Sequence, residues 1–299
     1  MVSMYQQITS NKRKSFLLIS LFVIILVGLG AIIGKITGNF ESWIFGAVLV
    51  SFVMTLFSYF AGDKVALATA RAKQIKKEDN PYLWRLVENL SITAGLPMPD
   101  VYIIPDQSIN AFATGRDPKH SSVAVTLGAL NKLDKVELEG VLAHELSHIK
   151  NYDIRLMMLV IILVGSIALM SDFFLRTQFF RRRRDREEGN ADVLLFIMGI
   201  ILAILSPIIA QIIQLAVSRE REFLADASGA MLTRYPEGLA RALEKIALEG
   251  MAMQNPNNAT AHLYISDPFG KKKISWLHKL FMTHPPIEER IKRLREMGV

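Results

Sequence analysis

The residues most suited to chemistry in this chain are the histidines and the glutamate of His144-Glu145-Leu146-Ser147-His148. On a helix, residues four apart project from the same face, so two imidazoles at this spacing can bind one metal ion. The glutamate between them then points at the open coordination position of the metal, where it can take a proton from water. Zinc suits this set because it accepts two nitrogens and one carboxylate oxygen and keeps a water in the fourth position. The stretch therefore predicts a hydrolytic zinc site with one ion per subunit, His144 and His148 as ligands and Glu145 as general base.

Such a site needs a third ligand, and the chain contains no cysteine. The best candidate is Glu222, in the charged stretch that follows the last apolar run. Asp226 lies four residues later, so it can accept a hydrogen bond from the outer N–H of a ligand histidine. Two alternatives remain open at this point. In the first, the stretch is only a solvated helix end, and Glu220 or another carboxylate is the ligand. In the second, the two histidines are ordinary surface residues on a helix.

The composition places these residues in a membrane protein. Of 299 residues, 51% are hydrophobic and 21% are charged, and the mean hydropathy is +0.28. This excludes a disordered or collagen-like chain, and the absence of cysteine excludes disulfides and a cysteine nucleophile. The formal net charge of +7 indicates topology signals and anionic lipid. Nucleic acid is not expected, because no aromatic stacking pattern accompanies the arginine run at 181–184.

The first two of four apolar runs, at 15–33 and 43–62, are separated by a short loop. Their length predicts an antiparallel transmembrane hairpin, with a buried core hairpin as the alternative. The first run is too long for a signal peptide. Lys12, Arg13 and Lys14 precede it and further basic residues follow the second run, which places both ends of the hairpin in the cytoplasm.

The topology of the other two runs, at 156–175 and 193–217, is open. The loop between them contains Arg181 to Arg184, and simple alternation puts this loop outside, against the positive-inside rule. Pro207, Gln211 and Gln214 are also disfavoured by hydrocarbon. The pair therefore spans the bilayer, is re-entrant, or packs as a shielded helical hairpin, giving two to four transmembrane helices in all.

The remaining segments predict a catalytic domain in two parts, 63–154 and 218–299, separated by the second hairpin at 155–217 and preceded by the first at 1–62. The first part carries a helix at 81–95, strands at 101–104, 111–114 and 122–127, and the metal-site helix, which Asp134 and Glu137 open as a capping pair. The second part is mostly helical. One helix runs from the membrane edge to about residue 232, a second begins after Pro236, and a third begins after Pro286. Short spacers between the site and the apolar runs predict that the metal lies close to the bilayer.

Taken together, HELSHIKNYD, SREREFLAD, a late THPP and the two apolar pairs resemble the HtpX-type membrane zinc metalloproteases, which are related to the CAAX prenyl protease I family. The resemblance covers nearly the whole chain. It implies His144, His148 and Glu222 as zinc ligands and Glu145 as general base. It also implies cleavage of misfolded or damaged membrane proteins in bacterial quality control and stress response.

Two further segments gain an interpretation from this resemblance. Residues Asn110, Ala111, Phe112, Ala113 and Thr114 resemble the edge strand beside the active-site cleft, which can pair with an extended substrate; the alternative is an ordinary strand. His284 in THPP matches a late family motif and can donate a hydrogen bond to the oxyanion. Alternatively it caps the last helix, with Arg290 pairing locally. His120, His262 and His278 are expected to be surface or structural residues.

The expected fold class is a mainly α-helical membrane protein of α+β type, with a zincin-like catalytic domain carrying a small β-sheet. The expected protein is a multi-pass zinc endopeptidase of the bacterial cell membrane, with its catalytic domain facing the cytoplasm. Its partners are membrane-protein or unfolded polypeptide substrates and the lipid bilayer, and its oligomeric state is open. A CAAX-type processing protease and a non-catalytic scaffold stabilised by zinc are the alternatives.

Overall fold

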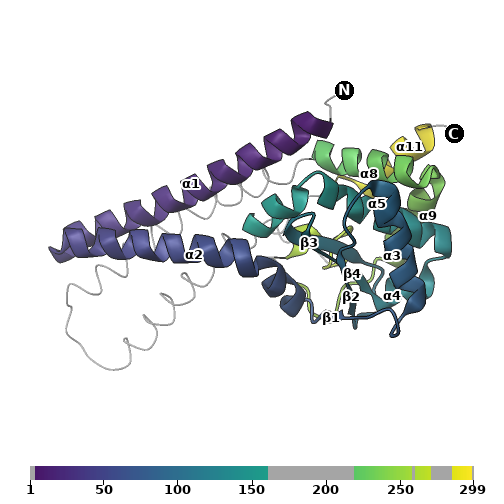
Figure 1. Ribbon diagram of the computed structural model, residues 1–299, viewed down its shortest axis with the longest axis horizontal. Helices are drawn as coiled ribbons and strands as arrows, with labels where there is room; N and C mark the ends of the chain where they lie inside the picture. The colour runs from purple at the N-terminus through teal and green to yellow at the C-terminus, as the bar shows by residue number, and fades with distance from the viewer. Residues whose placement is uncertain (1–3, 161–218, 258–259, 271–284, 298–299) are drawn as a thin grey trace.

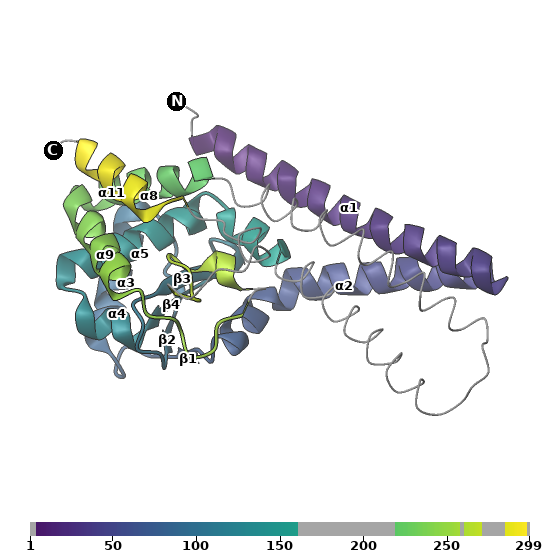
Figure 2. The ribbon, with the colours of Figure 1, turned by 180° about the vertical axis from the view of Figure 1, so that it is seen from behind.

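The computed structural model describes residues 4–160, 219–257, 260–270 and 285–297. Two long helices, α1 (Met4–Thr37) and α2 (Phe40–Thr69), form a hairpin that projects from a globular body (Figures 1 and 2). The apolar runs at 156–175 and 193–217 lie outside the described residues apart from 156–160. The arginine loop and His284 also lie outside them.

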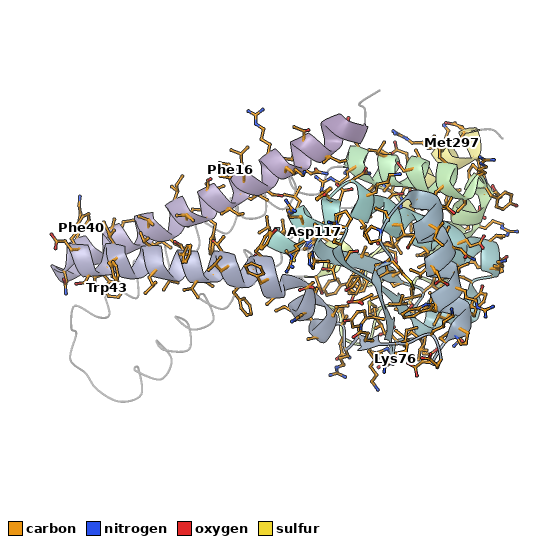
Figure 3. The ribbon with its side chains drawn as sticks, in the orientation of Figure 1. Phe16, Phe40, Trp43, Lys76, Asp117 and Met297 are labelled. Carbon is orange, nitrogen blue, oxygen red and sulfur yellow. The ribbon has the colours of Figure 1, made fainter. Side chains whose placement is uncertain are left out.

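The two helices of the hairpin match the first predicted pair in position and in apolar length. Spans of 28 and 30 residues in α1 and α2 are apolar enough to cross a membrane, and each exceeds the ~20 residues that a ~30 Å core requires. Phe16, Phe40 and Trp43 point outward from the hairpin (Figure 3). The two helices approach closely at Gly30, where an added Cβ would lie 2.6 Å from the Cβ of Ala47. The second helix continues past residue 62 and carries the chain into the globular body.

A small mixed sheet lies at the centre of the body. Its order is β1-β2-β4-β3, from β1 (Lys73–Gln74), β2 (Asp100–Ile104), β4 (His120–Thr126) and β3 (Ala111–Asp117). The central pair β2 and β4 is parallel, and the two outer pairs are antiparallel. Three strands match the prediction. The fourth, β1, has two residues, too few for an alternating pattern to be visible.

Helices surround this sheet. They are α3 (Pro81–Ala94), α4 (Leu127–Lys132), α5 (Lys135–Lys150), α8 (Arg219–Thr233), α9 (Pro236–Glu249), the short 3₁₀ turn η1 (Ala261–Leu263) and α11 (Ile287–Glu296), and residues 153–160 are also helical. The expected extension of the third strand to Leu127 is wrong. The side chain of Thr126 accepts a hydrogen bond from the backbone N–H of Ala129, so the chain turns there into α4.

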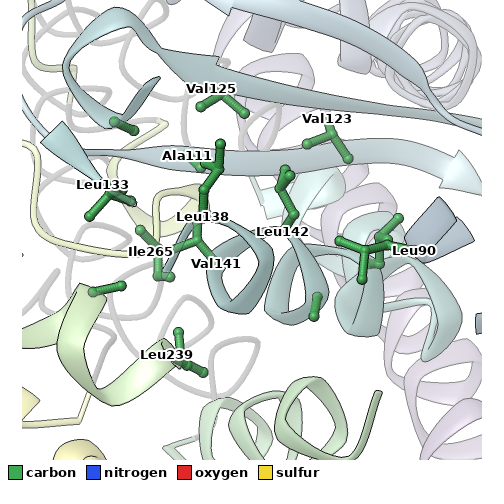
Figure 4. Close-up of a cluster of buried hydrophobic side chains, with 14 of the residues drawn as sticks. Leu90, Ala111, Val123, Val125, Leu133, Leu138, Val141, Leu142, Leu239 and Ile265 are labelled. Atoms are coloured by element: carbon green, nitrogen blue, oxygen red, sulfur yellow. The ribbon is translucent and has the colours of Figure 1, made fainter. Parts of the chain in front are cut away.

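The main hydrophobic core fills the space between one sheet face and α5. Val123 and Val125 of β4 project onto Leu138 and Leu142 of α5 (Figure 4). Ala124, between those valines, joins a second cluster on the opposite face. This alternation is what a strand buried on both faces requires. The core therefore fixes α5, the helix with both candidate histidines, against the sheet.

Candidate metal centre and active site

Helix α5 holds the two histidines of the motif in the arrangement that the sequence predicts. A complete capping box begins the helix, with Asp134 accepting from the backbone N–H of Glu137 (2.9 Å) and Glu137 accepting from that of Asp134 (2.8 Å). His144 and His148 are both buried, at 1% and 4% exposure. Their Nε2 atoms face each other at 3.1 Å.

Helix α8 brings the predicted third ligand to the same point. The carboxylate of Glu222 lies 3.7 Å from Nε2 of His144 and 3.5 Å from Nε2 of His148. The three candidate ligand atoms lie within 4.8 Å of one another. Close approach of α8 to α5 depends on Gly229, where an added Cβ would lie 2.9 Å from the backbone nitrogen of His144. A residue without a side chain therefore lets the two ligand-bearing helices meet.

The donor set fits a metal ion. The Nδ1 atom of each histidine lies 2.9 Å from a carboxylate, Asp226 for His144 and Asp153 for His148. The neighbouring carboxylates favour a proton on Nδ1 of each histidine, so that the Nε2 lone pairs face one another and the charge of Glu222, an arrangement that a cation between them would stabilise. Ligand atoms about 2.0–2.1 Å from a tetrahedral ion lie about 3.3–3.4 Å apart. The observed separations of 3.1, 3.5 and 3.7 Å are close to this value.

Asp226 occupies the place that the sequence analysis proposes for it, and it has a second partner that was not anticipated. Arg290 of α11 donates two hydrogen bonds to Asp226, at 2.8 and 2.7 Å, and a third to the carbonyl of Ile265 at 3.1 Å. Burial alone would raise the pKa of Asp226, but the charge of Arg290 and the hydrogen bond from His144 lower it to about 2. Arg290 is fully buried, so it belongs to the site and does not pair locally.

Asp153, the last residue of HELSHIKNYD, holds the second histidine. The chain ends α5 at Lys150, turns at Tyr152 with a left-handed φ of 60°, and directs Asp153 back toward His148. Such a φ costs a non-glycine residue about 1–3 kcal/mol and persists only where surrounding contacts hold it. Burial alone would lower the pKa of His148, but the hydrogen bond to Asp153 and the charge of Glu222 raise it to about 9. The negative charge that favours a proton here also favours a metal cation.

Glu145, the candidate general base, is buried between α5 and the sheet at 1% exposure. Burial, assisted by the charge of Glu222 and opposed by that of His148, raises the pKa of its carboxyl to about 7. The backbone of Ala113 in β3 lies beside this carboxylate and acts to lower its pKa, less strongly than burial raises it. A carboxyl with this pKa can both accept and release a proton near neutral pH.

The five residues from Asn110 to Thr114 are buried, and β3 is the terminal strand of the described sheet. Part of its outer edge is paired within the chain. The backbone N–H of Ile265 donates to the carbonyl of Ala111 at 3.0 Å, Phe112 forms a β-bridge with Tyr264, and the amide of Asn110 donates to the carbonyl of Ser266 at 3.1 Å. Within the described residues, this pairing ends at Phe112. Ala113, beside Glu145, is the first residue of β3 beyond it.

The remaining histidines are separate from this cluster where the structure describes them. His120 is exposed and lies 2.9 Å from Asp117. His262 is buried, and its Nε2 lies 3.0 Å from the carbonyl of Met157. Neither groups with the three candidate ligands. His278, like His284, is outside the described residues.

Comparison with known proteins agrees with this geometry. Residues 77–298 match peptidase family M48. The chain is 46% identical to a protease HtpX homolog of Tropheryma whipplei (strain Twist) over 295 residues, covering 99% of each protein. It is 46% identical to the homolog of Dictyoglomus thermophilum, covering 98% of this chain and 95% of the relative, and 43% identical to that of Ligilactobacillus salivarius, covering 98% and 100%.

A solved structure shares the fold. The crystal structure of S. mikatae Ste24p matches with a TM-score of 0.52 at 18% identity. The match covers 93% of this chain, which spans 62% of the length of that protein. This likeness supports the arrangement of helices and sheet alone. The match of residues 77–298 and the relatives at 43–46% identity show that the chain belongs to peptidase family M48, the metalloprotease family of the HtpX homologs.

Proposed function

We propose that this protein is a membrane-bound zinc endopeptidase that hydrolyses peptide bonds of misfolded or damaged membrane proteins and of unfolded polypeptides. One zinc ion per subunit is held by His144, His148 and Glu222. The observation that carries the proposal is the meeting of these three side chains, with two imidazole Nε2 atoms 3.1 Å apart and a carboxylate beside both. Two imidazoles and one carboxylate are the protein ligands of many hydrolytic zinc sites.

The bound zinc would supply Lewis-acid chemistry, polarising the scissile carbonyl and lowering the pKa of water. Glu145 accepts a proton from the attacking water and passes it to the leaving amine, a task suited to its pKa of about 7. Asp226 and Asp153 fix the orientation of the two imidazoles through their Nδ1 atoms. The backbone of β3 from Ala113 onward aligns an extended substrate beside Glu145. In this scheme His284 donates a hydrogen bond to the oxyanion that forms at the scissile carbonyl. This role of His284 rests on its sequence motif.

We place the protein in the bacterial cell membrane as a multi-pass protein with the catalytic domain on the cytoplasmic side. The support is the pair of apolar helices α1 and α2 and the basic residues at the two ends of the hairpin. Membrane proteins and unfolded polypeptides are proposed as substrates because a protease site close to the bilayer can reach them.

The variant Glu145→Gln tests the mechanism. We expect the purified full-length variant to retain zinc and to cleave an unfolded substrate such as casein about 10²–10⁴-fold more slowly, because a positioned general base contributes about that factor. Glu139→Gln, a change of the same type on the same helix, should retain wild-type activity. A wild-type rate for a zinc-loaded Glu145→Gln protein would contradict the protease mechanism and favour the scaffold, which needs three ligands but no base.

A CAAX-type processing protease predicts a different specificity. Cleavage rates for casein-like peptides and for peptides with a prenylated C-terminus separate the two enzyme classes. We expect efficient cleavage without a prenyl group. If cleavage strictly requires the prenyl group, the CAAX-type processing function replaces the proposed quality-control function.

A further inference from the structure

The first membrane helix reaches the candidate metal site through one side chain. Asn11 of α1 is 2% exposed. Its amide Nδ2 donates to Oδ1 of Asp153 at 2.6 Å and to the backbone carbonyl of Asn151 at 2.9 Å. Both views of the ribbon show the first turns of α1 beside the start of α8 (Figures 1 and 2). Both protons of one amide group are thus directed at the turn that follows α5.

The partner of Asn11 is the carboxylate that orients His148. Oδ2 of Asp153 lies 2.9 Å from Nδ1 of His148, while Oδ1 accepts from Asn11 and lies 3.2 Å from Nε of Arg221. Asp153 is fully buried. Without the donors on Oδ1, this carboxylate would be free to rotate away from His148.

Contacts from α1 also cover the turn itself. The ammonium of Lys12 lies 4.7 Å from the ring centroid of Tyr152, the residue with the left-handed φ. Asn11 and Lys12 therefore contact Asn151, Tyr152 and Asp153, the three consecutive residues that bring the chain back toward His148. A left-handed tyrosine needs such external support.

We propose that Asn11 is a positioning residue of the metal site, so that the first membrane helix holds His148 in its metal-binding orientation through Asp153. This inference rests on the proposed role of His148 as a zinc ligand. A polar residue buried on α1 does not have to contact the turn after α5. Ser15, one turn later and also buried, instead donates to the carbonyl of Asn11 within its own helix at 2.9 Å.

The test uses the full-length protein in detergent, with Zn²⁺ affinity measured by competition against a chelator. Loss of a residue that orients a metal ligand typically weakens metal binding or activity about 10- to 100-fold. Because Asn11 acts through Asp153, we expect Asn11→Ala to weaken zinc binding by about tenfold, at the lower end of that range. We expect kcat on casein to fall with KM unchanged. Asn11→Leu, which keeps about the size of the side chain and removes both donors without adding a charge, should show the same loss.

Two controls separate positioning from general damage to α1. Ser15→Ala changes a buried polar residue on the same helix and should leave zinc affinity and kcat at wild-type values. In an Asp153→Asn background, Asn11→Ala should cause no further loss, since the residue through which it acts has already been changed. Thermal unfolding of each variant, with and without Zn²⁺, verifies that it is folded.

Different results overturn the two proposals. If wild-type protein binds zinc and cleaves casein while Asn11→Ala and Asn11→Leu bind zinc equally tightly, this inference is wrong and the proposed function stands. An undiminished effect of Asn11→Ala in the Asp153→Asn background also overturns it. Wild-type protein that binds no zinc overturns the proposed function and this inference together.

Discussion

The two histidines of the candidate site have the same proposed role as zinc ligands, and different regions of the molecule hold them in place. His144 is oriented by Asp226, which Arg290 of α11 holds with two charged hydrogen bonds. His148 is oriented by Asp153, which lies beyond a left-handed turn and is held by the neutral amide of Asn11 in the membrane hairpin. We name these the Arg290 support and the Asn11 support. The Arg290 support connects the site to the globular body, and the Asn11 support connects it to α1.

The difference extends to the electrostatics of the two imidazoles. Burial, together with the charges of His148 and Arg290, lowers the pKa of His144 although Asp226 acts in the opposite direction. The pKa of His148 is raised to about 9, because Asp153 and Glu222 outweigh burial. The charges of Glu222 and Glu145 act on His148 and raise its pKa, whereas the charges of His148 and Arg290 act on His144 and lower its pKa. This contrast shows that two histidines of one motif can have different electrostatic surroundings.

The largest effect expected from breaking either support is that of Arg290→Met. It leaves the carboxylate of Asp226 buried without its cation, which typically costs about 3–5 kcal/mol. We expect this loss in the free energy of unfolding, measured by denaturant titration in detergent. Lys292→Met is the matched control on the same helix. Its side chain is 75% exposed, so its change should stay below about 1 kcal/mol. Equal values for the two variants would contradict the Arg290 support.

Removing the two carboxylates compares the supports directly. We expect Asp226→Asn and Asp153→Asn each to weaken zinc binding about 10- to 100-fold, because each carboxylate orients one of the two proposed histidine ligands. The loss of stability should be greater for Asp226→Asn, since Arg290 makes two short hydrogen bonds to Asp226 and Arg221 makes one longer contact to Asp153. Chelator competition and denaturant titration measure the two quantities. The opposite order of stabilities would refute the assignment of the stronger support to Asp226.

Gly229→Ala separates α5 from α8, the helix that carries both Glu222 and Asp226. The added Cβ would lie 2.9 Å from the backbone nitrogen of His144, so the helix carrying Glu222 must shift. Overpacking of this kind costs about 1–3 kcal/mol, and we expect weaker zinc binding together with lower stability. Gly28→Ala, where an added Cβ meets nothing within 4 Å, is the control. An unchanged zinc affinity in Gly229→Ala would show that this contact does not determine how closely α8 approaches α5.

The smallest effect belongs to Lys12→Met, which removes the ammonium over the ring of Tyr152. An exposed cation–π contact contributes about 0.5–1 kcal/mol, so we expect a small decrease in thermal stability and a change in zinc affinity of less than about threefold. Lys35→Met, at the other end of α1, should change neither. A loss in Lys12→Met as great as in Asp153→Asn would move the main role in the turn from Asn11 to Lys12.

Local spacing accounts for what could be predicted from the sequence. His144 and His148 lie four residues apart on a capped helix, as do Glu222 and Asp226, and a helix places such pairs on one face wherever it packs. The same reasoning found the hairpin and most of the body helices. It extended one strand too far at Thr126, whose hydroxyl begins a helix. Periodicity carried no information on the two-residue strand β1.

Contacts between distant segments account for what was missed. Arg290 lies 64 positions from Asp226, and Asn11 lies 142 positions from Asp153; no periodicity links residues so far apart. A weak signal was present for Asn11, an amide residue directly before the basic residues Lys12 to Lys14 that precede the first apolar run. A second was Asp153, five residues after His148 and just beyond the helix. Neither shows which partner is met until the chain has folded.

The hydrogen bonds of Asn11 have a practical consequence for biochemistry on this protein. A soluble fragment that begins after α2 keeps the three candidate ligands, Glu145 and the Arg290 support. It loses the amide that donates to Asp153, and Tyr152 at the left-handed turn loses its contact with Lys12. Poor activity of such a fragment would therefore report damage at His148 as well as the loss of the bilayer. Supplying α1 as a separate peptide, with Asn11 or with alanine in its place, would distinguish the two causes.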